Sequence, residues 1–173
     1  MAQERTGVIT FKGGPLTLVG PELKVGDKAP EFSVVDGGLA EVTLKSSAGK
    51  TRLISVVPSL DTPVCDQQTR KFNEAAAKLP ASVAVITVSV DLPFAQKRFC
   101  STAGIEKVQV VSDYKTRDFG HKYGLFIKEL ALLTRAVLVV GADDKIKYLE
   151  VVKEVTSTPD YDKALNAAKT AAS

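Results

Sequence analysis

The chain has 173 residues, of which 45% are hydrophobic and 25% are charged, and its formal net charge is +3. This composition is sufficient for a buried core, and the length predicts one domain over residues 1–173. The basic residues are scattered rather than grouped in runs, which argues against a nucleic-acid-binding surface, and the longest apolar runs are far too short to span a bilayer.

The N-terminal segment MAQERTGVITFKGG is polar and lacks the apolar core of a secretory signal. We therefore expect a cytoplasmic protein, in which cysteines are free or redox-active rather than permanently paired. The chain has only two cysteines and one histidine, fewer than the ligand set of a structural zinc site. No metal site and no cofactor are predicted.

The first third of the chain is rich in strand patterns. Two hairpins are expected there, one around residues 8–19 and one around residues 32–44. Pairs of glycines directly after Lys12 and Asp36 supply the turns, since glycine tolerates the backbone angles that tight turns need.

The middle of the chain alternates strands and helices. Residues 52–57 form an apolar run typical of a strand buried on both faces, and residues 83–90 form another. Between them, residues 63–79 carry apolar side chains at helical spacing. This order predicts two parallel strands joined by a right-handed crossover. A second helix is expected from about Pro93 to Gly104, with Asp91 as its N-terminal cap.

The last third supplies a strand at residues 108–113, a short helical turn near residues 118–124 followed by a loop, and a hairpin over residues 135–152. An alanine-rich helix begins near Tyr161. The whole order is that of a thioredoxin-like α/β fold, with a central mixed sheet flanked by helices and an N-terminal β-hairpin extension.

Cys65 follows a helix-start signal. Thr62 is a good N-cap, and Pro63 suits the first helical position because its missing N–H is not needed there. Cys65 then lies in the first turn, where free backbone N–H groups and the helix dipole favour the thiolate, the nucleophilic form of the side chain. Asp61 and Asp66 oppose this effect, so a cation has to come from elsewhere in the fold. The alternative is an inert cysteine packed under the helix.

The segment from Pro58 through Thr62 to Cys65 resembles the PxxxTxxC signature of the peroxiredoxins, thiol-dependent peroxidases on a thioredoxin-like fold. The flanking segments GVITFKGGPLTLVG, GDKAPEFSVVD, KRFCSTAGI and EVTSTPDYDKAL are similar, in this order, to those of the thiol peroxidase branch, the atypical two-cysteine bacterial type. The resemblance covers nearly the whole chain. It implies an enzyme that reduces hydrogen peroxide and organic hydroperoxides without a metal, flavin or haem.

The resemblance also assigns roles to individual residues. Cys65 would be the peroxidatic cysteine, which becomes a sulfenic acid, and Cys100 would be the resolving cysteine, which forms an intramolecular disulfide with it. Thr62 would hydrogen-bond the peroxide and the sulfur. Pro58 would shield the sulfur from water, and Arg135 would supply the missing cation. Thioredoxin would reduce the disulfide, and the protein would be a homodimer.

The residues alone leave alternatives open. Arg52 and Arg70 are rivals of Arg135 as the partner of Cys65, because spacing does not separate them. A cysteine–histidine pair is another way to activate a thiol, but His121 lies in a short turn and is expected at the surface. Two other functions compete with catalysis: a redox sensor that switches without turnover, and a scaffold with two packing cysteines.

Cys100 lies about two turns into the second helix, where a core position is the alternative to a resolving role. A disulfide requires Cα atoms within about 7 Å and suitably directed side chains. Two cysteines packed on different helices are not expected to meet that condition in the reduced state. We therefore predict local unwinding around Cys65, Cys100 or both before the disulfide closes.

Overall fold

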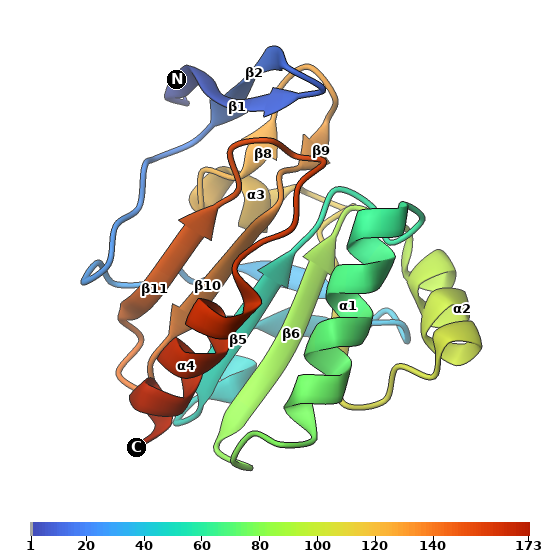
Figure 1. Cartoon of the computed structure of the whole chain (residues 1–173), viewed down its shortest axis with the longest axis vertical. Coiled ribbons are helices and arrows are strands. Elements are labelled where there is room, and N and C mark those ends of the chain that lie inside the picture. The colour runs from blue at the N-terminus through green and yellow to red at the C-terminus, as the bar shows by residue number, and fades with distance from the viewer. Residues whose placement is uncertain (1) are drawn as a thin grey trace.

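The computed structural model describes residues 2–173, which form two β-sheets and several helices (Figure 1). The strands are β1 (Glu4–Phe11), β2 (Gly14–Val19), β3 (Ser33–Val35), β4 (Glu41–Thr43), β5 (Thr51–Val56), β6 (Val83–Ser89), β7 (Gln109–Ser112), β8 (Phe126–Ile127), β9 (Leu132–Leu133), β10 (Ala136–Val140) and β11 (Ile146–Val151). The α-helices are α1 (Pro63–Ala76), α2 (Pro93–Ala103), α3 (Asp118–Lys122) and α4 (Tyr161–Ala172), and a 3-10 helix covers Leu44–Ser47.

The larger sheet has the strand order β11-β10-β5-β6-β7-β3-β4. The strands β5, β6 and β7 are parallel neighbours, whereas β10, β11, β3 and β4 pair antiparallel with theirs. The parallel core follows from the strand–helix–strand order of the middle of the chain, because parallel neighbours need a crossover and α1 and α2 provide it. The mixed sheet flanked by helices is the one predicted from the sequence.

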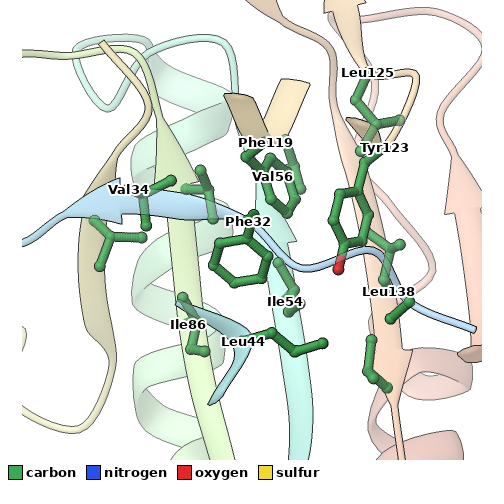
Figure 2. Close-up of a cluster of buried hydrophobic side chains, with 14 of the residues drawn as sticks. Phe32, Val34, Leu44, Ile54, Val56, Ile86, Phe119, Tyr123, Leu125 and Leu138 are labelled. Atoms are coloured by element: carbon green, nitrogen blue, oxygen red, sulfur yellow. The ribbon is translucent and has the colours of Figure 1, made fainter. Parts of the chain in front are cut away.

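Side chains of the central strands alternate between two cores. On one face, where α1 and α4 lie (Figure 1), Val137 and Val139 pack with Phe72 of α1 and Ala164 of α4. On the other face Leu138 packs in a second cluster (Figure 2), which contains the aromatic side chains Phe32, Phe119 and Tyr123. Since both faces are covered, the strands β5 and β10 are buried throughout, which explains their continuous apolar runs.

The N-terminal hairpin builds a second, four-stranded sheet, in the order β1-β2-β8-β9. The strands β8 and β9 fall in the segment that was expected to be a loop, so that prediction was wrong there. Each of them has only two residues, too few for a periodic pattern to appear in the sequence. They form because β2 offers a pairing edge to β8 at Leu18 and Val19.

Two further predictions about helix ends were wrong. The first helix ends at Ala76 rather than near residue 79. The N-cap of α2 is Leu92, which makes no side-chain capping bond. Asp91, the predicted cap, instead directs its carboxylate to other segments of the chain, including Ser59 and the backbone of Leu60.

One carboxylate fastens the N-terminal hairpin to the segment between β11 and α4. Glu154 accepts hydrogen bonds from the Thr10 hydroxyl and the Gly13 N–H at 2.9 Å each, and from the hydroxyl and N–H of Thr156 at 2.6 and 2.9 Å. The bonds from Thr156, followed by that from Gly13, lower the pKa of Glu154 to about 2. The next residue, Val155, uses its carbonyl oxygen to hold Arg135 at 2.7 Å, so this fastening also steadies a candidate site residue.

We predict that Glu154→Gln destabilises the protein at neutral pH and has little effect near pH 2. The pKa of this carboxylate falls from its ordinary 4.5 to about 2 on folding. Its contribution to the free energy of unfolding is therefore fully present above pH 4.5 and disappears as the pH falls through 2. Urea unfolding of both proteins across this range measures the difference. A difference that stays constant with pH would contradict the assignment.

Candidate active site

Cys65 lies in the first turn of α1, as the sequence predicts. Thr62 has extended backbone angles (φ −119°, ψ 148°), Pro63 is the first helical residue, and the Cys65 N–H donates to the Thr62 hydroxyl oxygen at 3.4 Å. The Cys65 side chain is 0% exposed. Because the first-turn N–H groups and the positive end of the helix dipole surround it, this position favours a negative charge on the sulfur.

The Thr62 hydroxyl has two partners in this structure. Its oxygen accepts from Cys65 N, and its proton is donated to the Ser59 carbonyl oxygen at 3.2 Å. A hydroxyl has a single proton. Donation to a bound substrate oxygen therefore requires this group to rotate away from Ser59.

Arg135 brings a cation to the buried sulfur. Its Nη2 donates to Cys65 Sγ at 3.2 Å, although the two residues are 70 positions apart in the sequence. Arg135 directly precedes β10 and is itself buried, with 2% of its surface exposed. Its other donors are also used: Nε binds the Val155 carbonyl oxygen at 2.7 Å and Nη1 binds Gln68 Oε1 at 2.9 Å. The planar guanidinium is thus held in one orientation by these three hydrogen bonds.

The rival cations lie elsewhere. Arg52 is buried, but its guanidinium binds Ser47, Gly141, Leu44 and Asp144. Arg70 is exposed and pairs with Asp66, the acidic neighbour in the first turn of α1.

His121, as expected, is exposed. Its ring lies against Phe126, with the ring centroids 4.6 Å apart. Among the described residues, Arg135 is the basic side chain that hydrogen-bonds the Cys65 sulfur.

Gln68 completes the site, and the sequence analysis did not identify it. It is fully buried and joins Arg135 to Ser55 of β5, since its Nε2 donates to Ser55 Oγ at 2.7 Å. A signal was present: Gln68 follows Cys65 by three residues, which places both on the same helix face. A polar residue on the face that packs on the sheet needs a partner there.

Cys100 is half-buried in α2, and both cysteines are free thiols. Cys65 belongs to an apolar cluster against which Cys100 packs from a different helix. Burial raises the pKa of the Cys100 thiol, so in this conformation Cys100 is a weak nucleophile. Pro58 is buried in the segment between β5 and α1. The structure therefore brings together Cys65, Thr62 and Arg135, and keeps Cys100 on a neighbouring element.

No three His, Cys, Asp or Glu side chains within residues 2–173 gather as they would around a metal ion. In the same part of the chain, no helix has both the length and the apolar character needed to cross a bilayer.

We predict that Gln68→Leu slows alkylation of Cys65 by iodoacetamide at neutral pH and lowers the free energy of unfolding by about 2 kcal/mol, since a buried guanidinium donor is left unpaired. Gln67→Leu is the matched control, because Gln67 is the exposed neighbour on the same helix. Equal effects of the two substitutions would show that Gln68 does not hold Arg135 in place.

Comparison with known proteins places this arrangement in a family. The sequence pattern of the Redoxin family matches residues 24–165. The chain is 61% identical to the thiol peroxidase of Halalkalibacterium halodurans, over 94% of this chain and 98% of that protein, and 54% identical to the thiol peroxidase of Bacillus subtilis, over 93% and 96%.

Solved structures agree with the sequence comparison. The crystal structure of a peroxiredoxin-like protein from Aquifex aeolicus has a TM-score of 0.89 and 46% sequence identity, over 98% of each chain. The thiol peroxidase from Chromobacterium violaceum, at 22% identity, shares the fold with a TM-score of 0.82, over 90% of this chain and 91% of that one. The chain therefore belongs to the Redoxin family and is a peroxiredoxin-type enzyme, a peroxidase of the thiol peroxidase group.

Proposed function

We propose that Cys65 is the peroxidatic cysteine and that it reduces hydrogen peroxide and organic hydroperoxides. The observation that carries this proposal is the hydrogen bond of 3.2 Å from Arg135 to the Cys65 sulfur, made between two buried side chains. A buried cation beside a thiol at a helix N-terminus favours the thiolate. Burying a guanidinium costs free energy, and a cysteine that only packs in the core does not need a cation beside it.

The first chemical step transfers one oxygen atom. The thiolate sulfur attacks the terminal peroxide oxygen, an S–O bond forms and the O–O bond breaks. Sulfur loses two electrons and becomes a sulfenic acid, while the departing alkoxide or hydroxide takes a proton from water to give an alcohol or water. Negative charge spreads over sulfur and both oxygens in the transition state, and preorganised donors such as Arg135 stabilise it as it develops.

Thr62 and Pro58 act on the same step in this proposal. Once the Thr62 hydroxyl rotates away from Ser59, it can donate to a peroxide oxygen while its own oxygen still caps the helix. Pro58 is buried within the segment that leads to Cys65, and in this proposal it limits access of water to the sulfur. Since Cys65 is 0% exposed, a peroxide reaches the sulfur only when neighbouring groups move.

Cys100 is the proposed resolving cysteine. Its sulfur attacks the sulfenic sulfur, the S–S bond forms and the S–O bond breaks, and the departing hydroxide combines with the Cys100 proton to give water. Burial holds the pKa of this thiol above its usual value, and unwinding around Cys100 removes that obstacle. The position of Cys100 suits such unwinding, because it lies in the last turn of α2, which ends at Ala103, and the ends of helices fray more readily than their interiors.

Thioredoxin is the proposed reductant. One of its thiolates attacks the Cys65–Cys100 disulfide, and its second thiol releases the mixed disulfide, so that both cysteines of this chain return to the thiol state. Three broader expectations stay predictions: a single domain over residues 1–173, a homodimer in solution and a cytoplasmic location. Sedimentation of the purified protein tests the second of these.

We predict that Cys65→Ser abolishes peroxide consumption in the presence of a thioredoxin system. Cys100→Ser should still consume one equivalent of peroxide and stop at the sulfenic acid, which intact-mass spectrometry detects. Turnover in Cys65→Ser would refute the peroxidatic role. Single-turnover oxidation of the unaltered protein, without recycling by thioredoxin, would favour a redox sensor instead.

We predict that Arg135→Met lowers the second-order rate of Cys65 oxidation about a hundredfold or more, the usual effect of removing one preorganised donor. Arg70→Met is the matched control, because Arg70 is exposed and makes no contact with the sulfur. Competition against a peroxidase of known rate measures both variants. Similar rates for Arg135→Met and the unaltered protein would contradict the proposed role.

A further inference from the structure

A single carboxylate joins the loop before Cys65 to the segment that leads into α2, the helix that carries Cys100. Asp91 lies between β6 and α2, two residues before Pro93. Its Oδ1 accepts from the Ser59 hydroxyl at 2.7 Å, and its Oδ2 accepts from the Leu60 N–H at 2.8 Å and from the Ser89 hydroxyl at 2.7 Å. Bonds of neutral donors to a carboxylate are stronger than bonds between neutral groups.

The connection continues into α2. The Ser89 hydroxyl oxygen accepts from Gln96 Nε2 at 3.0 Å, and the same Nε2 also donates to the Val111 carbonyl oxygen at 2.7 Å. Gln96 is fully enclosed, at 1% exposure, and precedes Cys100 by four residues on the same helix face. A continuous chain of hydrogen bonds therefore runs from Ser59 through Asp91, Ser89 and Gln96 to the turn that carries Cys100.

The chain of bonds borders an open groove. A cavity of about 710 Å³ separates the loop before α1 from α2, and its lining includes Ser59, Leu60, Asp91, Phe99 and Thr102. The loop is thus held to the start of α2 through Asp91, and free space lies beside this connection. Either element has room to shift on this side once the carboxylate no longer holds the loop.

We propose that Asp91 is a positioning residue that latches the two cysteine-bearing elements in the reduced arrangement, and that release of this latch limits the rate of disulfide closure. The inference rests on the proposed Cys65–Cys100 disulfide and adds the group that controls its formation. In the latched state Cys65 stays with Arg135, and Cys100 stays on α2. Opening frees the loop directly, and it loosens the hold on α2, because the helix is linked to Asp91 through Ser89 and Gln96.

The test follows the disulfide step directly in the full-length protein. Reduced protein is mixed with one equivalent of hydrogen peroxide and quenched with an alkylating agent at increasing times. Intact-mass spectrometry then separates the sulfenic and disulfide forms. This readout suits a chain without tryptophan, and the first-order rate that it gives does not depend on peroxide concentration.

We expect Asp91→Asn to form the disulfide about fivefold faster than the unaltered protein, the effect of losing roughly one net hydrogen bond from the closed state. Ser59→Ala, which removes one bond to Asp91, should give a smaller increase. Glu31→Gln is the matched control, because Glu31 also accepts backbone N–H bonds, from Leu44 and Lys45, in another part of the fold. It should leave the rate unchanged.

Acceleration distinguishes a latch from a merely structural residue, since general damage to the fold has no reason to speed a specific chemical step. An unchanged or slower rate in folded Asp91→Asn overturns the latch. If that variant does not fold, Ser59→Ala decides: a faster rate supports the latch and an unchanged rate overturns it. Absence of a disulfide in the unaltered protein would instead refute the proposed function, and the latch with it.

Discussion

The site depends on the burial of one guanidinium against one sulfur. Arg135 is 2% exposed and Cys65 is 0% exposed, so neither group can rely on water to stabilise its charge. Every contact of Arg135 is accordingly supplied by the fold: Val155 from the segment after β11, Gln68 from α1, and the sulfur itself. A buried cation held this way is stable only if its partners are polar or negative. The same enclosure that costs stability makes the charge effective at the sulfur, because little solvent screens it.

The parts of the site that are local in sequence could be predicted, and the parts that depend on tertiary structure could not. The start of α1 follows from Thr62 and Pro63 alone, since a capping hydroxyl and a first-turn proline act over a few residues. Spacing does not distinguish Arg135 from its rivals, because the sheet order β10-β5 brings it to α1; only the family resemblance pointed to it. Asp91 was assigned wrongly for the same reason: a local capping role looked plausible, but Ser59 and Leu60 from a distant loop bind its carboxylate.

The two cysteines meet opposite demands, and the fold separates them accordingly. Cys65 is placed at a helix N-terminus beside a cation, where the thiolate is favoured. Cys100 lies within a helix, where burial raises the pKa of its thiol. In the proposed cycle the first arrangement promotes attack on peroxide, and the second postpones the disulfide until the helix opens. In the same proposal, the hydrogen bonds of Asp91 between the loop before α1 and the start of α2 set how long the sulfenic acid persists. A longer-lived sulfenic acid has more time to undergo irreversible oxidation.

The proposed function assigns to Arg135 the stabilisation of negative charge on the Cys65 sulfur, through the hydrogen bond of 3.2 Å between them. Ultraviolet absorbance of the thiolate measures this contribution when the Cys100→Ser protein is compared with the Cys100→Ser, Arg135→Met protein at the same pH, because Cys65 is then the only thiol in the chain. We expect a stronger thiolate signal when Arg135 is present. Equal signals from the two proteins would refute this role of Arg135.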